Sequence, residues 1–356
     1  MISRNSHTLE WITQVRESSP GAKLDPILIE KMIMALTLVE HLRSSGLEFV
    51  FKGGTSLALV LKELRRFSID IDIIVSPNQD LHECFQAILE QGPFSSYEED
   101  QRDSGNIPKG HFKFFFHSVI VEKESHILLD VLFEENLYAQ LQEIEIRSSI
   151  LAIENECTRV FCPIPECLLG DKLTAFAPHT TGIQYRKNKE LEIAKQLFDI
   201  AALFDVSRNI DLICITHAKI SSKELAYRGL NQYTPRDVLI DTFRTACLIG
   251  MHGHSGILDE YNELKDGIAK LKGFIYSGVF SPDSAVLCAA KVSVLVAAIL
   301  TQQDSISRFH KEINLSKVSI SDPSYNKLNR IKKTNPEAFF YFHQAQDILK
   351  SDGPGR

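Results

Sequence analysis

The stretch FKGGTSLALVLKELRRFSIDIDIIV, residues 51–75, carries most of what the sequence says about fold and chemistry. It opens with two glycines and two hydroxyl residues, Gly53 to Ser56, ahead of an apolar segment that predicts a helix. It closes on Ile-Asp-Ile-Asp-Ile-Ile-Val, which predicts a strand. Because side chains alternate between the two faces of a strand, Asp70 and Asp72 are expected to face the same way. Two carboxylates held side by side usually need a cation between them.

The turn Lys52-Gly53-Gly54-Thr55-Ser56 joins a predicted strand to a predicted helix. Glycines let the backbone approach a ligand closely, and the first turn of a helix offers unpaired N–H groups to an anion. Ser56 is expected to add a hydroxyl to a phosphate oxygen. The turn is not a Walker A motif, because the final Gly-Lys-Ser/Thr is missing. Taken alone, a glycine pair is equally compatible with a plain tight turn.

A third acid accompanies the aspartate pair. Asp130 lies in HILLDVLF, an apolar strand in which an unpaired charge would be costly. Carboxylate oxygens are the ligands that suit Mg²⁺, which binds through one or two carboxylates together with substrate phosphates. We expect Asp70, Asp72 and Asp130 to converge on one edge of a sheet and to serve a displacement at phosphorus. The alternative is a strand edge with solvated acids.

The pattern along the chain predicts two kinds of structure, and 356 residues suffice for two domains. The first part predicts helices at 8–17, 25–45, 56–66 and 79–91 and strands at 47–52, 67–76, 109–117 and 122–133. From about Pro165 onward only helices are predicted, at 166–177, 188–205, 217–229, 235–250, 256–272, 283–301 and 335–350. We therefore predict an α+β fold, with a sheet-containing domain over 1–165 and an all-helical domain over 166–356.

Composition narrows the class of protein. The hydrophobic share of 44% and the charged share of 24% are those of an ordinary globular protein. No secretory signal and no apolar run of roughly 18–20 residues is evident, so we expect no membrane association and a cytoplasmic location. Seven cysteines in apolar contexts fit reduced thiols. The net charge of −7 gives no general attraction to nucleic acid, so RNA would need a local basic run such as 185–195 or 326–333.

GGTSL, a helix and then RFSIDIDIIV resemble the nucleotidyltransferase superfamily related to DNA polymerase β. More closely, they resemble the AbiEii/AbiGii-type nucleotidyltransferase toxins, the bacterial family that includes the MenT toxins. The motifs GG(T/S)xL and RxSxDxD of that family both stand here in full. Its KLxA motif is matched by Lys172-Leu173-Thr174-Ala175. Its KDxxDL helix is matched by Lys195-Gln196-Leu197-Phe198-Asp199-Ile200, in which Gln196 replaces the usual aspartate.

The resemblance implies a nucleotidyltransferase-type mixed sheet with flanking helices, and a helical domain that completes the active site. The nucleotide-binding residues would be Lys52, Gly53, Gly54, Thr55, Ser56, Ser68 and Lys195. The catalytic residues would be Asp70, Asp72, Lys172 and Asp199. Asp70 and Asp72, with Asp130 placed by the wider superfamily, would hold Mg²⁺, or Mn²⁺ in its place. Taken alone, Lys172 is also compatible with a lysine whose stem lies along the surface.

The resemblance further implies a toxin of a bacterial toxin–antitoxin or phage-defence system, with a cognate antitoxin as partner. The reaction would transfer a nucleotide from a nucleoside triphosphate to an acceptor, and tRNA is the first acceptor to test. Two alternatives remain open from the residues. One is an enzyme that uses the same site to modify a protein. The other is a nucleotide-binding module that has lost catalysis, and the replacement of the usual aspartate by Gln196 would be a sign of that loss.

Overall fold

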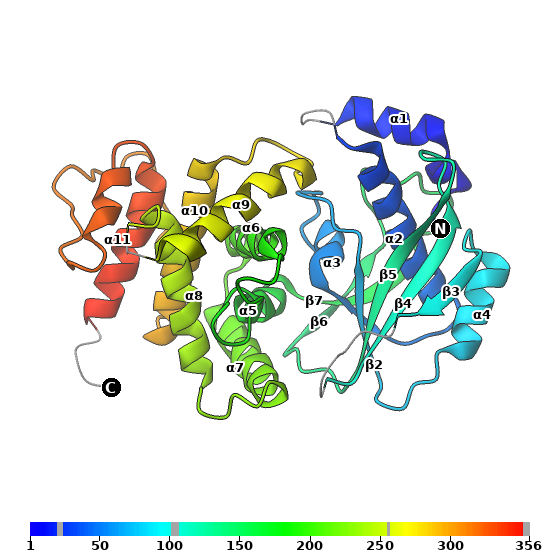
Figure 1. Cartoon of the computed structure of the whole chain (residues 1–356), viewed down its shortest axis with the longest axis horizontal. Helices are drawn as coiled ribbons and strands as arrows, with labels where there is room; N and C mark the ends of the chain where they lie inside the picture. The colour runs from blue at the N-terminus through cyan, green and yellow to red at the C-terminus, as the bar shows by residue number, and fades with distance from the viewer. Residues whose placement is uncertain (20–23, 101–106, 255–256, 352–356) are drawn as a thin grey trace. The chain divides into compact units, whose positions relative to one another are not determined.

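The chain forms two compact units in the computed structural model (Figure 1). The first unit comprises Met1–Ile164 together with Gly273–Val279, and the second comprises Pro165–Lys272 and the chain from Phe280 onward. The structure describes residues 1–19, 24–100, 107–254 and 257–351. The first unit is therefore discontinuous in sequence. The predicted division into 1–165 and 166–356 did not assign Gly273–Val279 to the first unit.

The described part of the first unit is built on a seven-stranded sheet with the strand order β3-β4-β5-β2-β1-β7-β6. The strands are β1 Val50–Lys52, β2 Ile71–Val75, β3 Ser96–Glu99, β4 Lys109–His117, β5 Glu124–Phe133, β6 Leu141–Glu145 and β7 Arg159–Pro163. β2 runs parallel to β5 and β1 runs parallel to β7, while the other neighbours are antiparallel. The mixed sheet is as predicted.

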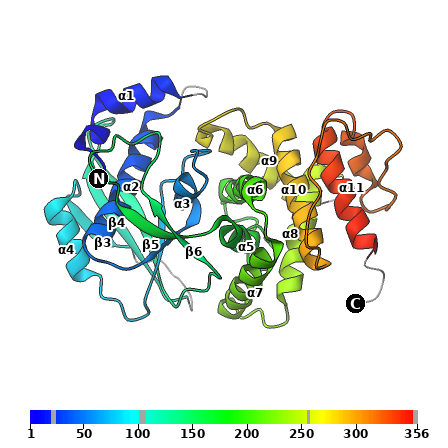
Figure 2. The same ribbon diagram turned by 180° about the vertical axis from the view of Figure 1, so that it is seen from behind.

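The first unit also contains α-helices, which flank this sheet (Figures 1 and 2). They are α1 Leu9–Ser18, α2 Pro26–Ser44, α3 Gly53–Val60 and α4 His82–Gln91. α2 starts where the sequence indicates, because the Asp25 side chain accepts a hydrogen bond from the backbone N–H of Ile27 and Pro26 opens the helix. Most of α2 is buried, and it contacts α1, α3, α4 and β5. In β2, Ile71 and Ile73 are fully buried, so this helix-covered core fixes which way Asp72 faces.

Two predicted elements differ from the structure where the chain meets residues far away in sequence. The predicted helix 56–66 ends at Val60, because the following segment pairs with the chain near residue 275: Arg66 forms an antiparallel bridge with Ile275, and the N–H of Phe67 donates to the carbonyl of Phe274 at 2.7 Å. The predicted strand 67–76 begins only at Ile71, so Asp70 stands one residue before β2.

The regular elements of the second unit are helices joined by loops, and its described residues contain no strand, as predicted; the predicted helix 217–229 begins earlier, at Ile210. Its α-helices are α5 Pro165–Ala175, α6 Glu190–Val206, α7 Ile210–Tyr227, α8 Pro235–Gly250, α9 Leu258–Leu271, α10 Pro282–Leu300 and α11 Pro336–Ser351. α8 has the predicted bounds because its start is encoded locally. Thr234 and Asp237 form a reciprocal capping box, and Pro235 occupies the first turn.

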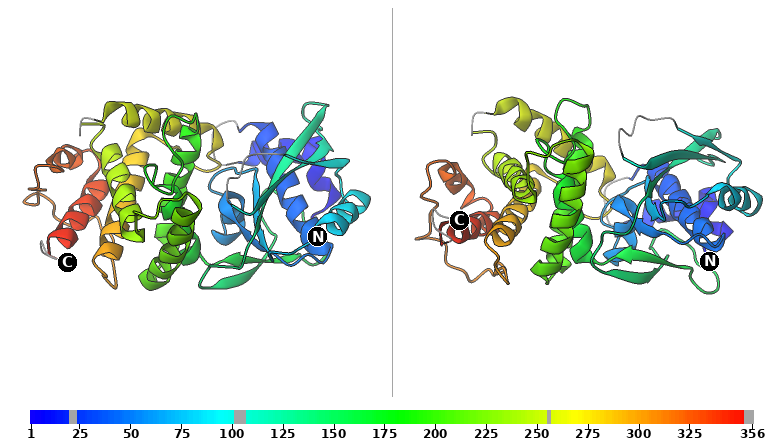
Figure 3. Two further views of the ribbon diagram at one scale, coloured as in Figure 1. Left: turned by 60° about the horizontal axis from the view of Figure 1, so that its bottom comes forward. Right: turned by 90° about the horizontal axis from the view of Figure 1, so that it is seen from below.

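α10 corrects the expectation that no apolar segment is long enough to span a bilayer. Its 19 residues have a hydropathy of 2.0 over an 18-residue window, which by length and composition suffices for a span. In the structure 72% of that window is buried, and α10 packs against α6, α8 and α11. Figure 3 shows the helices of this unit from two further directions. The apolar character of α10 is that of a central core helix.

Candidate functional site

The glycine turn lies directly against the second aspartate of the DxD pair. Gly53 is the first residue of α3 and has a φ of +79°, in the left-handed region that favours glycine. A Cβ atom at Gly53 would lie 2.0 Å from Oδ2 of Asp72, a distance at which one of the two groups would have to move. The Asp72 carboxylate therefore sits on the backbone at the N-terminus of α3, and only glycine leaves room for it there.

The second glycine makes room for the residues just before β2. A Cβ atom at Gly54 would lie 2.7 Å from Oγ of Ser68 and 2.8 Å from Nη2 of Arg66. Arg66 is buried, and its Nη1 donates to the carbonyl of Phe67 at 2.9 Å. The glycine turn and the RFSIDID stretch, which are separated by a dozen residues, thus meet at the first turn of α3.

The two hydroxyl residues of the turn hold the loop together. Both are fully buried. Oγ1 of Thr55 donates to the carbonyl of Asp70 at 2.5 Å, and Oγ of Ser56 donates to the carbonyl of Gly53 at 2.9 Å. Thr55 therefore positions Asp70, which is exposed at the surface. The predicted contact of the Ser56 hydroxyl with phosphate stays a prediction, while the backbone N–H groups of the first turn of α3 provide the positive helix end that an anion requires.

Four strands bring charged and polar residues into one row across the sheet. Lys52 lies opposite Asp72, Asp72 opposite Asp130, and Asp130 opposite His111. Residues directly opposite each other project on the same face of a sheet, so these four form a continuous row. Nδ1 of His111 lies 2.7 Å from Oδ1 of Asp130, and their side chains are 13% and 30% exposed. Sequence reasoning missed His111, because only the strand register places it beside Asp130.

The chemistry of this donor set fits Mg²⁺. Asp70 and Asp72 provide carboxylate oxygens beside the N-terminus of α3, where phosphate oxygens can complete the coordination of a hard cation. Across the described residues, no group of three or more His, Cys, Asp or Glu side chains forms a ready-made metal site. The arrangement therefore suits a cation that is coordinated by one or two carboxylates together with the oxygens of a bound phosphate. Whether Asp130 joins them stays a prediction.

In the second unit, two of the predicted catalytic residues pair with each other. Nζ of Lys172 on α5 lies 2.9 Å from Oδ2 of Asp199 on α6, and their side chains are 8% and 1% exposed. A surface position for Lys172 is therefore wrong. Lys195 lies on the same helix as Asp199, with its Nζ 3.9 Å from Oε1 of Glu192. That Lys172, Lys195 and Asp199 complete the site of the first unit stays a prediction.

Gln196, which stands where the family motif usually has aspartate, has an unsatisfied side-chain oxygen in the described structure. Oε1 of Gln196 is buried and has no hydrogen-bond partner among the residues that the structure describes. Because Lys172 is the partner of Asp199, the buried ion pair does not depend on an acid at position 196. The replacement of aspartate by Gln196 therefore leaves the pair intact.

Comparison with known proteins gives one family match. The sequence profile described as "Nucleotidyl transferase AbiEii toxin, Type IV TA system" matches residues 38–246, more than half of the chain. This range contains the glycine turn, the aspartates and both members of the Lys172–Asp199 pair. No protein with a curated description matches the chain significantly.

Solved structures with low sequence identity are also similar to the chain. A candidate nucleotidyltransferase from H. pylori has 13% identity and a TM-score of 0.43, over 78% of this chain and 95% of its own. JHP933 from Helicobacter pylori has 16% identity and a TM-score of 0.40, over 79% and 94%. MenT4, a nucleotidyltransferase toxin from Mycobacterium tuberculosis H37Rv, has 12% identity and a TM-score of 0.45, over 93% and 98%.

Proposed function

Because the chain belongs to the AbiEii family of nucleotidyltransferase toxins, we propose that it transfers a nucleotide from a nucleoside triphosphate to an RNA hydroxyl in a Mg²⁺-dependent reaction. The observation that carries this proposal is the position of the Asp72 carboxylate against Gly53, at the N-terminus of α3. A helix N-terminus attracts the anionic phosphates, and an adjacent carboxylate anchors the cation that accompanies them.

Each part of the first unit has its own task in this reaction. The backbone N–H groups at the start of α3 bind phosphate oxygens, and Gly53 and Gly54 let those oxygens approach. Asp70 and Asp72, with Asp130 as a third acid, would hold Mg²⁺. When bound, the cation would neutralise charge on the triphosphate oxygens, including the charge that develops on the leaving oxygen. Thr55 keeps Asp70 in place through its hydrogen bond to the Asp70 carbonyl.

The transfer itself needs positioning more than covalent help. The acceptor hydroxyl oxygen forms a bond to the α-phosphorus while the bond from this phosphorus to the bridging oxygen breaks, and pyrophosphate leaves with that oxygen. The hydroxyl proton passes to a carboxylate of the site or to water. Lys172 would neutralise charge on the triphosphate, held in place by Asp199, and Lys195 would bind the nucleotide from the same helix.

An exposed basic segment supports RNA as the acceptor. Arg186, Lys187 and Lys189 precede α6 and are all exposed, so their charges are available to phosphates of an RNA backbone. The overall charge of −7 makes such a local segment necessary. We take tRNA as the first candidate, and we place the reaction in the cytoplasm of a bacterium, where a cognate antitoxin would restrain it in a toxin–antitoxin or phage-defence setting.

The experiment incubates the full chain with Mg²⁺, each labelled nucleoside triphosphate in turn, total bacterial tRNA and a cell extract, alongside Asp72→Ala. Label on RNA that is lost in Asp72→Ala supports the proposal and identifies the nucleotide. Label on a protein would replace RNA by a protein acceptor. An absence of label in every lane, with the protein folded, would overturn transfer to these acceptors. Omitting Mg²⁺, or replacing it by Mn²⁺, tests the cation directly.

A further inference from the structure

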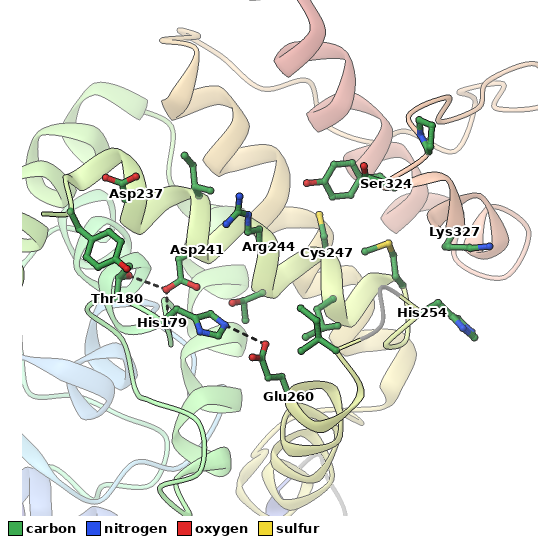
Figure 4. A pocket seen from close by; sticks show the side chains of 18 residues that line it. His179, Thr180, Asp237, Asp241, Arg244, Cys247, His254, Glu260, Ser324 and Lys327 are labelled. Atoms are coloured by element: carbon green, nitrogen blue, oxygen red, sulfur yellow. Dashed lines mark hydrogen bonds and ion pairs between the residues drawn. The ribbon is translucent and has the colours of Figure 1, made fainter. Parts of the chain in front are cut away.

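Two of the cavities in the described part of the second unit differ in the charge of their linings. The first has a volume of about 830 Å³ and lies along α8 (Figure 4). Its acids outnumber its lysine and arginine side chains, with Asp237, Asp241 and Glu260 against Arg244 and Lys327. Figure 4 shows two of these acids already held by neighbouring side chains of the lining. This cavity therefore does not favour an anionic ligand.

The second cavity is a groove with the opposite balance of charge. It has a volume of about 800 Å³ and is formed by residues 309–316 and 332–337, and we call it the basic groove. Lys311, Lys332 and Lys333 line it against one acid, Glu337, among the described lining residues. Glu337 lies in the first turn of α11, where the positive end of the helix dipole offsets its charge. The basic groove therefore attracts an anion.

Two lysines of the basic groove are available to a ligand. Lys311 and Lys333 are exposed, and neither side chain makes a hydrogen bond or an ion pair with the described residues. Lys332 has a structural task instead, because its Nζ donates to the carbonyls of Ser316 and Val318 at 2.9 and 2.7 Å. Lys332 thereby joins the two chain segments that carry Lys311 and Lys333.

The basic groove also has an apolar wall. Phe309, Ile313 and Leu315 line it and are half-buried, so part of each side chain is open to a ligand. The ring of Phe309 packs against the ring of Phe340, with the centroids 5.7 Å apart. Proteins bind single-stranded nucleic acid with cations that hold phosphates and with aromatic faces on which bases stack. The basic groove contains both.

The basic groove lies in a segment whose charge is opposite to that of the whole chain. Residues 307–335, between α10 and α11 (Figure 1), contain seven Lys or Arg and two Asp or Glu, a net charge of +5. The whole chain carries −7, so the remainder carries −12 and repels polyanions. The segment lies beyond residues 38–246, which the family profile matches, so the family match assigns it no role.

We propose that the basic groove binds single-stranded RNA, with phosphates on Lys311 and Lys333 and a base against Phe309. A groove accommodates a strand better than the plane of a membrane, and an aromatic face favours a nucleic acid over an acidic peptide. The inference rests on the proposed function in that it names where the RNA acceptor is held. RNA binding is measured without nucleotide transfer, so the two proposals can fail independently.

The test measures fluorescence anisotropy of a labelled oligoadenylate RNA with the full chain carrying Asp72→Ala, in EDTA and without nucleoside triphosphate. Lys311→Ala/Lys333→Ala should weaken binding by about tenfold. It should also reduce the slope of log affinity against log salt by about 1.4, because each phosphate contact on a single strand contributes about 0.7. Lys311→Arg/Lys333→Arg keeps both charges and should retain binding.

A control of equal charge change separates the basic groove from the overall charge of the protein. Lys219→Ala/Lys265→Ala removes two exposed lysines from α7 and α9, outside the basic groove, and should leave affinity and salt slope unchanged. Binding that Lys311→Ala/Lys333→Ala leaves unchanged, or that both double variants weaken equally, overturns the proposal. RNA binding through the basic groove without any nucleotide transfer would contradict the proposed function alone.

Competing polyanions test the chemistry of the partner. Inorganic polyphosphate of matched charge should bind more weakly than oligoadenylate, because it has no base to stack on Phe309. Equal binding of polyphosphate overturns the assignment to RNA. Polyglutamate, or vesicles containing phosphatidylserine, that displace oligoadenylate at equal charge would also overturn it, in favour of an acidic protein or a membrane.

Discussion

The ammonium nitrogen of Lys172 lies 2.9 Å from a carboxylate oxygen of Asp199, and both side chains are withdrawn from solvent. Two helices, α5 and α6, are joined by this contact. Removing the Asp199 carboxylate takes away the charge that the buried Lys172 ammonium group contacts, which is far more costly than losing an exposed ion pair. The two residues that the family motifs assign to chemistry therefore also stabilise the helical unit, and activity and stability must be measured separately.

Replacing one member of this pair should destabilise the protein strongly. For Asp199→Leu we expect the free energy of unfolding to fall by about 3–5 kcal/mol, because the buried ammonium group of Lys172 loses the carboxylate that it contacts. In the double variant Lys172→Met/Asp199→Leu most of this loss should return, while nucleotide transfer stays absent. Urea unfolding measures both. Asp347→Asn, which removes an exposed partner of His343, is the matched control and should cost about 0–1 kcal/mol. A double variant that is no more stable than the single one would contradict this reading.

Gly53→Ala should abolish most of the activity through Asp72. The new Cβ would stand 2.0 Å from the Asp72 carboxylate and force it to move, and a displacement of about 1 Å at a reacting centre can cost about 10²-fold in rate. Gly46→Ala is a matched control, because Gly46 also has a positive φ, of +87°, but has open space around its Cβ position. Gly46→Ala should lose thermal stability through its positive φ alone and keep transfer, while Gly53→Ala should lose transfer and lose more stability, because of its clash with Asp72. Equal activity in the two would show that the position of Asp72 is unimportant.

His111→Gln tests whether Asp130 takes part in the site. If Asp130 acts beside Asp72, loss of its partner should lower nucleotide transfer by about 10–100-fold and raise the Mg²⁺ concentration needed for half-maximal rate. The initial rate is measured as a function of Mg²⁺ concentration. His117→Gln provides the control on the same strand, since His117 is exposed at the end of β4. A Mg²⁺ dependence identical to that of the unchanged protein would remove Asp130 from the candidate ligands.

Acid should destabilise the second unit through His217. This residue on α7 is 1% exposed, and burial lowers its pKa from 6.5 to about 4. Between about pH 6.5 and about pH 4, His217 is protonated in the unfolded chain and neutral in the folded chain. The free energy of unfolding therefore falls over this interval, by about 1.4 kcal/mol per pH unit for this group.

The check is urea unfolding between pH 7 and pH 4.5 with His217→Gln, whose stability should decline less steeply. A residual slope is expected from His7 in the first unit, whose pKa burial also lowers to about 4. His82→Gln, at an exposed position, should follow the unchanged protein. Parallel curves for His217→Gln and the unchanged protein would mean that His217 is protonated without penalty in the fold.

Elements with local signals were predictable from the sequence. α8 has its predicted bounds because Thr234, Pro235 and Asp237 specify its first turn by themselves. β4 likewise has its predicted bounds, since alternate phenylalanines give a clear two-residue period. The short edge strands β3 and β6, with the sequences SYEE and LQEIE, were missed because they carry few apolar residues.

Structural features that depend on residues far away in the sequence were not predictable. The predicted helix 56–66 stops at Val60 because Arg66 and Phe67 are bound by residues near 275, which no local pattern reveals. The place of His111 beside Asp130 follows from strand register, and the pairing of Lys172 with Asp199 follows from helix packing. The close approach of the glycine turn to Asp72 was predictable because both motifs lie within one short stretch of sequence, and the roles of these residues stay predictions.

The return of Gly273–Val279 to the first unit has a consequence for biosynthesis. Ile275 bridges to Arg66, the N–H of Tyr276 donates to the carbonyl of Arg65 at 3.0 Å, and the ring of Tyr276 stands edge-on to Phe67. A ribosome must therefore translate past residue 279 before the segment that leads into the DxD pair acquires its partner. During most of its synthesis the nascent chain lacks this support, so the segment that leads into the DxD pair reaches its folded form only late in translation.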